Sequence, residues 1–372
     1  MVGAGELRRE LADELPAMLS EIERLASIDS GSYDTAGVDA VADGFGELFA
    51  ARGFDVSRIG HELTARRDLG PGPALLLLGH ADTVWAEGWP VTRDGDWLRG
   101  PGVGDMKGCV VMAAHALGVA LAHRPERLGA VEVLIVPDEE LGSPASRVWI
   151  EERARAADAC LGLEAGWPGG GVVVARGAVG AFYVTARGRT AHVAAHEDEG
   201  ASAVSVLAPL VAAIEACSRD GARASVGVFR GGTARQVVPG EAEIHVDLRA
   251  PDAAGADALL ARVQAVAAAG GGGGVELQVR GGFTRPPLEE DRSRRLWGLA
   301  QARAAELGIP LVAERSRGGS DASFAAALGV ETLDGLGPIC HDSCARGERI
   351  EIGSLVDRGA LLAGLVLDVF SG

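Results

Sequence analysis

The sequence of 372 residues is notably short of lysine. Lys107 is the only lysine among 35 basic residues, and these are outnumbered by 52 acidic residues, for a formal charge of −17. Because proteins that bind nucleic acids or anionic lipids need clustered Lys and Arg, this balance argues against both as partners. We expect a small-molecule substrate instead.

Cysteines and long apolar runs are also few. The five cysteines are an odd number and widely spread, which excludes a disulfide framework. No window holds about 18 uninterrupted apolar residues, so no membrane span is predicted. The dense charges of residues 1–30 leave no room for the apolar core of a signal peptide. These features favour a reduced, cytoplasmic protein.

The length and the order of predicted elements indicate two domains. Residues 5–27 and 36–52 have helical patterns, and short apolar runs at 74–78, 131–136 and 159–163 are typical of buried parallel strands. Residues 177–285 differ, because 241–249 alternate with a period of two, as in a half-buried antiparallel strand. We predict an α/β domain with a central, mostly parallel sheet (1–176 and 286–372), interrupted by an inserted α+β domain (177–285).

Acidic residues and histidines follow the predicted strands. Ligand sites gather beyond the carboxyl ends of parallel strands, and imidazole with carboxylates is a ligand set typical of zinc. Carboxylates that converge without a metal repel one another, so a divalent ion is the simplest explanation of the set. The residues concerned are His80, Asp82, Asp105, Glu139, Glu140, Glu164 and His341.

Five ordered blocks resemble the signature segments of the M20 metallopeptidase family, closest to its carboxypeptidase G2 branch. The blocks are Gly79-His80-Ala81-Asp82-Thr83-Val84, Gly104-Asp105-Met106-Lys107-Gly108, Asp138-Glu139-Glu140-x-Gly142-Ser143, Gly318-Gly319-Ser320-Asp321-Ala322, and His341 after Gly335-Leu336-Gly337-Pro338. The resemblance covers nearly the whole chain. It implies a zinc-exopeptidase-like catalytic domain and a ferredoxin-like inserted domain that acts as lid and homodimer interface.

The resemblance also implies two zinc ions per chain, with Co²⁺ or Mn²⁺ as alternatives. By motif, His80 and Glu164 would hold one ion, Glu140 and His341 the other, and Asp105 would bridge them. Asp82 would orient His80, and Glu139 would be the general base. The segment Cys340-His341-x-x-Cys344 also has the form of a thiolate zinc site. We interpret both cysteines as spectators, because carboxylate ligands are already present.

The inserted domain contains four further candidate site residues, of which the resemblance implies His192 and Arg249. His192 would reach the oxyanion across a dimer interface, with His196 as the weaker candidate. Arg249 would bind the substrate carboxylate, with a surface ion pair as the alternative interpretation, and Gln236 and Arg285 are further substrate contacts. The segment after Glu164 lacks the lysine that contacts a glutamate side chain in carboxypeptidase G2, so glutamate release is not implied.

These features predict a dizinc amide hydrolase that releases a C-terminal amino acid from a peptide or an N-acyl amino acid. One alternative is a deacylase of the acetylornithine type. Another is a non-catalytic relative that binds metal or a partner, against which the retained Glu139 argues.

Overall fold

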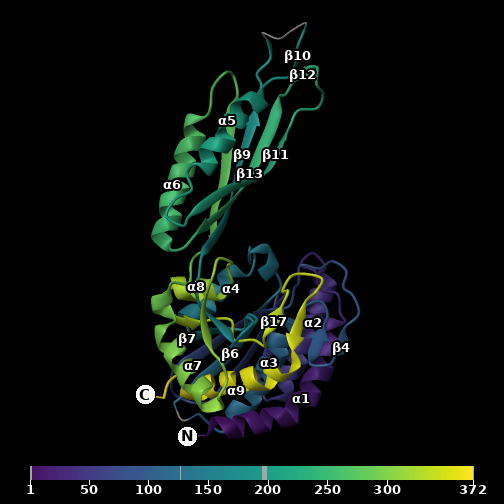
Figure 1. The fold of residues 1–372 in the computed structure, drawn as a ribbon, viewed down its shortest axis with the longest axis vertical. Coiled ribbons are helices and arrows are strands. Elements are labelled where there is room, and N and C mark those ends of the chain that lie inside the picture. The colour runs from purple at the N-terminus through teal and green to yellow at the C-terminus, as the bar shows by residue number, and fades with distance from the viewer. Residues whose placement is uncertain (1, 126, 195–198, 372) are drawn as a thin grey trace. The chain divides into compact units, whose positions relative to one another are not determined.

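The computed structural model describes residues 2–125, 127–194 and 199–371, which divide into two compact units (Figure 1). The first unit comprises Met1–Ala175, Leu288–Arg315 and Ser320–Gly372, and the second comprises Arg176–Pro287 with Ser316–Gly319. The short segment Ser316–Gly319 therefore groups with the second unit, although the sequence-based division assigns it to the first.

A six-stranded sheet forms the centre of the first unit. Its strand order is β1 (Asp55–Ile59), β2 (Glu62–Asp68), β6 (Ala130–Val136), β3 (Ala74–His80), β7 (Ala159–Gly162) and β16 (Glu331–Leu333). The four strands from β6 to β16 run parallel, and the β1–β2 hairpin joins β6 antiparallel. The predicted α/β fold with a central, mostly parallel sheet is confirmed.

Helices cover both faces of this sheet, so its inner strands are apolar on both sides. Leu75 and Leu77 of β3 pack with one group of helices, and Leu76 and Leu78 pack on the opposite face. The first group is α1 (Ala4–Ala26), α2 (Thr35–Ala51), α3 (Lys107–Ala122), α7 (Arg294–Leu307) and α9 (Ile352–Asp368); the second is α4 (Arg147–Arg155) and α8 (Ala322–Ala327).

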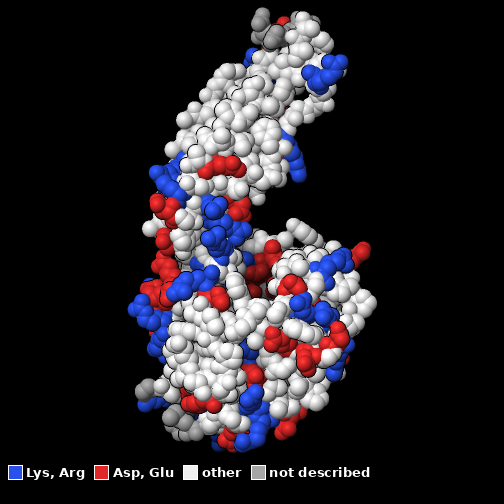
Figure 2. Space-filling view, in the orientation of Figure 1, with Lys and Arg blue, Asp and Glu red and all other residues white. Residues whose placement is uncertain are grey.

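Smaller sheets complete the first unit. One has the order β17 (Cys340–His341), β18 (Arg349–Glu351), β5 (Trp97–Arg99) and β4 (Thr92–Asp94), and β8 (Gly171–Arg176) pairs with β15 (Val312–Ser316). On the face of this unit drawn in Figure 2, acidic and basic side chains are interspersed. Within the described residues, no helix combines the length and the apolar character that crossing a membrane requires.

The second unit is a four-stranded antiparallel sheet with two helices on one face. The strands lie in the order β11 (Arg223–Gly231), β13 (Glu241–Ala250), β9 (Ala178–Arg187) and β14 (Glu276–Arg285). Helices α5 (Ala203–Glu215) and α6 (Ala253–Ala269) pack on it (Figure 1). Alternate residues of β9 are buried, which is the expected pattern when helices cover one face only. A short ribbon of β10 (Ala191–His192) and β12 (Val237–Val238) extends from this unit.

Candidate metal centre

The register of three neighbouring strands brings the predicted site residues to one edge of the central sheet. His80 is the last residue of β3 and pairs with Val136, the last residue of β6. On the other side of β3, Leu78 pairs with Gly162, the last residue of β7. Glu139 therefore follows the end of β6 by three residues, and Glu164 follows the end of β7 by two.

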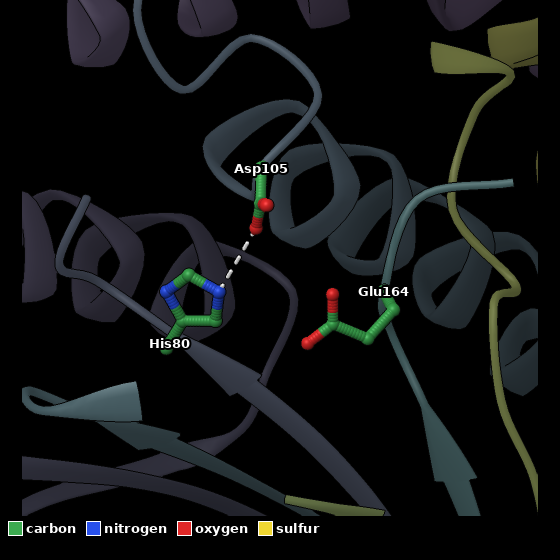
Figure 3. A group of neighbouring side chains, drawn as sticks. All are labelled: His80, Asp105 and Glu164. Carbon is green, nitrogen blue, oxygen red and sulfur yellow. Dashed lines mark hydrogen bonds and ion pairs between the residues drawn. The ribbon is translucent and has the colours of Figure 1, made fainter. Parts of the chain in front are cut away.

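Three ligand atoms converge at this edge (Figure 3). His80, Asp105 and Glu164 each offer one atom, and these atoms lie within 4.8 Å of one another. His80 Nε2 lies 3.1 Å from Asp105 Oδ1, and Figure 3 shows the Glu164 carboxylate extending from its own segment toward both. A buried imidazole with two carboxylates is a zinc-binding donor set.

Asp82 contacts several residues of the site without belonging to either group of candidate ligands. Its side chain is fully buried and lies 3.3 Å from His80 Nδ1. The carboxylate accepts hydrogen bonds from the backbone N–H groups of Glu139 (3.1 Å) and Glu140 (3.2 Å) and from Ser32 Oγ (2.7 Å). Asp82 thus orients the imidazole and also holds the turn that carries both glutamates.

That turn is a single 3₁₀ turn, Glu139–Leu141, which directs two adjacent glutamates differently. The Glu139 side chain is buried, and its charge acts on His80. Glu140 instead groups with Asp105 and Cys344, whose ligand atoms also lie within 4.8 Å of one another. The two glutamates therefore have separate surroundings, as one ligand and one base require.

Asp105 belongs to both ligand groups. Its Oδ1 faces His80, whereas its Oδ2 accepts a hydrogen bond from Ser343 Oγ at 2.8 Å and lies 3.0 Å from Cys344 Sγ. Each carboxylate oxygen of Asp105 thus faces a different group of candidate ligands, which is the arrangement expected of a bridging carboxylate.

His341 lies in different surroundings from those two groups. Its Nε2 is 2.9 Å from Glu351, and its ring packs edge-on against Trp97 with the centroids 5.0 Å apart. The preceding Cys340 is buried, and its Sγ lies where a Cβ on Gly104 would be. Because neighbouring residues of a strand point to opposite faces, the inward Cys340 turns His341 to the other side of β17.

Electrostatics at the centre reflect the crowding of carboxylates. Burial opposes ionisation of Asp105, but the hydrogen bond and the charge of His80, together with hydrogen bonds from Cys344 and Ser343, outweigh burial and lower the pKa of Asp105. Burial and the Asp105 charge together raise the pKa of Glu140 to about 8. Burial disfavours the imidazolium, but Asp105 and Asp82 raise the pKa of His80 well above its ordinary value. A bound cation would relieve the repulsion that these shifts express.

Two residues that the sequence analysis did not assign to the site support its loops. Glu348 is buried, and its Oε1 accepts hydrogen bonds from the backbone N–H groups of Gly104 (2.9 Å) and Asp105 (3.0 Å). Ser143 donates to Asp321 and so ties the glutamate turn to the start of α8. In the sequence, Glu348 is recognisable only as an acidic residue shortly before the last helix, which does not indicate its role.

Lys107 is buried at the start of α3, and its ammonium donates to the Ile28 carbonyl at 2.6 Å. Burial lowers the pKa of Lys107 to about 8. The single lysine of the chain therefore anchors the segment after α1 beside the Asp105 loop.

The remaining candidates belong to the second unit. His192 in β10 is exposed and accepts a hydrogen bond from Ala194 N at 3.2 Å, and the exposed Gln236 lies opposite, its carbonyl accepting from Val193 N at 3.2 Å. Arg249 forms a fork with Asp247, at 2.8 and 2.9 Å, and Arg285 is buried. His196 lies outside the described residues.

The donor set at the strand edge fits divalent zinc. Imidazole and carboxylate oxygens suit zinc, manganese and cobalt, and a thiol next to them shifts the preference toward zinc and cobalt. Both ligand groups supply three donors, the number that catalytic zinc sites use while leaving a coordination position open.

Comparisons with known proteins show what the whole chain is similar to. Carboxypeptidase G2 of Pseudomonas sp. is 27% identical over 380 residues, covering 97% of this chain and 91% of that protein. Succinyl-diaminopimelate desuccinylase of Alkalilimnicola ehrlichii is 32% identical over 358 residues, covering 86% and 92%. The aminopeptidase PepT structure from Bacillus cereus superposes with a TM-score of 0.78 at 20% identity, covering 95% of this chain and 98% of that one.

A family description matches most of the chain as well. Residues 76–368 match peptidase family M20/M25/M40, and this span begins in β3 and ends with α9. It therefore contains every residue of the two ligand groups. The chain belongs to peptidase family M20/M25/M40 and is a hydrolase.

Proposed function

We propose that this hydrolase uses two zinc ions to cleave an amide bond, and that it releases a C-terminal amino acid from a peptide or an N-acyl amino acid. The observation that carries the proposal is the convergence of His80, Asp105 and Glu164, with Glu139 on the neighbouring strand end. The resemblance assigns His341 to the second ion together with Glu140 and Asp105.

Zinc, when bound, would polarise the amide carbonyl and lower the pKa of the attacking water. Glu139 is the general base that takes the proton of this water and returns it to the leaving amine. Its burial keeps competing water away from the carboxylate, and the Asp82 hydrogen bond to its backbone N–H fixes the turn that carries it. Asp82 also keeps the His80 ring in one orientation.

The second unit is proposed to bind the substrate and stabilise the oxyanion. His192 is exposed on the β10–β12 ribbon, where it can donate to the oxyanion that forms on a substrate bound to a partner protomer. Arg249 is proposed to bind the substrate carboxylate, since its planar guanidinium already forms two parallel hydrogen bonds with a carboxylate, that of Asp247. Gln236 and Arg285 are proposed as further contacts, and a homodimer through this unit completes the assembly.

A deacylase that cleaves acetyl or succinyl amides is the second candidate. It is favoured by the relatives named succinyl-diaminopimelate desuccinylase, one of which is 32% identical to this chain. A non-catalytic relative is disfavoured, because a pure metal-binding protein does not need a buried carboxylate beside its ligands.

A substrate panel with controlled metal content tests the proposal. Protein stripped with chelator is expected to lose hydrolysis of dipeptides and N-acyl amino acids, and added zinc or cobalt is expected to restore it. Activity on acetyl or succinyl amides alone would favour the deacylase. Turnover that is indifferent to chelation, or none across the panel with two zinc ions bound, would refute the proposal.

A further inference from the structure

A cavity of about 450 Å³ lies beside the candidate metal centre, within the first unit. Its wall includes Glu140, a proposed metal ligand, and three large apolar side chains that the fold leaves exposed. These are Tyr33, Val84 and Leu141, with exposed fractions of 89%, 46% and 41%. The volume lies in the range of small-molecule sites, about 300–1,000 Å³. Exposed apolar side chains gathered around one cavity are typical of a binding site, whereas single ones scattered over a surface are not.

Asp82 ties the three parts of the cavity wall to the metal centre. Tyr33 follows Ser32, whose Oγ donates to Asp82 at 2.7 Å. Leu141 ends the 3₁₀ turn whose backbone also donates to this carboxylate, at 3.2 Å. Val84 comes two residues after Asp82 in the chain. The cavity therefore adjoins the metal centre and shares its supports.

The two loops that form one side of the cavity are also joined to each other. The backbone N–H of Thr83 donates to the Ser30 carbonyl at 2.8 Å, and that of Ser32 donates to the Thr83 carbonyl at 3.2 Å. Gly31 lies so close to the second loop that a Cβ on it would lie 2.7 Å from the Trp85 carbonyl oxygen. Because the wall is already ordered, a ligand does not have to order it on binding.

The charged side chains around the cavity are of one sign. Asp34 and Glu140 are acidic, and none of the described residues that line the cavity is lysine or arginine. Asp34 caps α2 by accepting a hydrogen bond from the backbone N–H of Gly37 at 3.2 Å, so its carboxylate is held in place. An anionic group in the cavity would lie near like charges without a basic partner, which is unfavourable. An uncharged, apolar group fits this cavity instead.

The chemistry of amide hydrolysis indicates which part of a substrate this group belongs to. Water attacks the carbonyl carbon of the amide, so the acyl group is attached directly to the atom that reacts at the metal centre. The carboxylate of the released amino acid is proposed to bind Arg249 of the second unit, and the acidic side chains of the cavity would repel it. The cavity therefore remains for the acyl side of the amide.

We infer that this cavity binds the acyl part of the substrate, and that it selects uncharged, apolar acyl groups over acetyl and over anionic groups such as succinyl. The inference rests on the proposed amide hydrolase and names its substrate class. Tyr33, Val84 and Leu141 determine the selectivity through their contact with the acyl chain. Acetyl, which buries the least apolar surface, is the reference against which that contact is measured.

Three N-acyl derivatives of one amino acid test the selectivity of the full-length, zinc-loaded protein. The acyl groups are acetyl, 4-methylpentanoyl and succinyl, and the last two have the same shape because a carboxylate replaces an isopropyl group. Each fully buried methylene raises kcat/KM roughly fourfold, so we expect 4-methylpentanoyl, with four more carbons, to exceed acetyl by at least about tenfold. We expect it to exceed succinyl by at least about tenfold as well. Equal or higher kcat/KM for acetyl or succinyl would overturn the inference.

Leu141→Asn and Val84→Thr test whether the selectivity comes from the cavity. Both side chains are exposed, so the substitutions leave the core of the first unit intact. We expect each variant to lower the ratio of kcat/KM for 4-methylpentanoyl to that for acetyl about threefold or more. Leu328→Asn and Val148→Thr are the matched controls, because they make the same changes at exposed positions of the first unit outside the cavity. The controls are expected to keep the wild-type ratio.

The remaining outcomes separate this inference from the proposed function. Cavity variants that lower kcat/KM equally for both substrates, or that match their controls, would overturn the inference while leaving the hydrolase intact. Cleavage of peptides without turnover of any N-acyl amino acid would also overturn the inference alone. No turnover of either class with two zinc ions bound would overturn the proposed function and the inference together.

Discussion

Replacing Asp82 by asparagine measures how much one buried carboxylate contributes to the stability of the protein and to the zinc affinity of the candidate metal centre. The two Asp82 oxygens accept hydrogen bonds from Ser32 Oγ and from the backbone N–H groups of Glu139 and Glu140. Asparagine keeps the shape of the side chain but turns one oxygen into an NH₂ group. Whichever way the amide is oriented, its NH₂ group faces one of the two backbone N–H groups.

The cost follows from this donor–donor conflict. The Ser32 hydroxyl can rotate to accept, but one buried N–H loses its acceptor, which costs about 1–3 kcal/mol. Removing the charge relieves repulsion with Glu140 but also loses the attraction of His80, which helps to lower the pKa of Asp82. We therefore expect the free energy of unfolding of the metal-free protein to fall by an amount within this range. Zinc affinity is expected to fall about 10–100-fold, because His80 loses its orienting carboxylate.

Urea unfolding followed by tryptophan fluorescence isolates the relevant unit, because all six tryptophans belong to the first unit. Competition with a chromogenic chelator gives the zinc affinity. Asp68→Asn is the control, since Asp68 is exposed and its ion pair with Arg66 lies at the surface. If Asp82→Asn stays within about 0.5 kcal/mol of this control and keeps its zinc affinity, the role given to Asp82 is wrong.

Three further substitutions probe neighbouring features. Glu139→Gln is expected to lower kcat about 10²–10⁴-fold with unchanged zinc content, measured on the best substrate of the panel; normal kcat would contradict its role as base. Lys107→Arg places a larger guanidinium group in the buried site beside the Ile28 carbonyl and is expected to destabilise the protein by about 1–3 kcal/mol. Urea unfolding measures this change, and unchanged stability would show that the single lysine is incidental. Glu348→Ala is expected to weaken zinc binding about 10–100-fold by freeing the Asp105 loop. Glu348→Gln, whose amide oxygen can accept the same two N–H groups, should recover most of that affinity, and equal losses in both variants would argue against this hydrogen-bonding role.

The fold was predictable where the burial of an element leaves a clear hydrophobic pattern in the sequence. β3, β6 and β7 are mostly apolar, because both faces of these strands are covered, and the runs at 74–78, 131–136 and 159–163 located them. The β1–β2 hairpin at the edge was not predicted. β1 is exposed or half-buried along its length and carries charged residues, so its apolar pattern is weak.

The candidate site was predictable to the extent that its residues follow strands. His80, Glu139 and Glu164 were located because parallel strands deliver their ends to one edge. Glu348 was missed because it acts through a backbone N–H group 243 residues away, a contact that leaves no local pattern. His341 as a metal ligand remains a prediction from the motif, because spacing alone does not tell how the loop after β17 turns its side chains.

The insertion of the second unit also affects how the chain folds as it leaves the ribosome. Arg176–Pro287 carries the four-stranded sheet, the β10–β12 ribbon and both helices of that unit in one continuous stretch, so it can fold while the rest is still being synthesised. The first unit has to wait, because β16 and α9 come after the insertion. Glu348 emerges after the whole insertion, so a nascent chain carries His80, Asp105 and Glu164 before the support of the Asp105 loop exists.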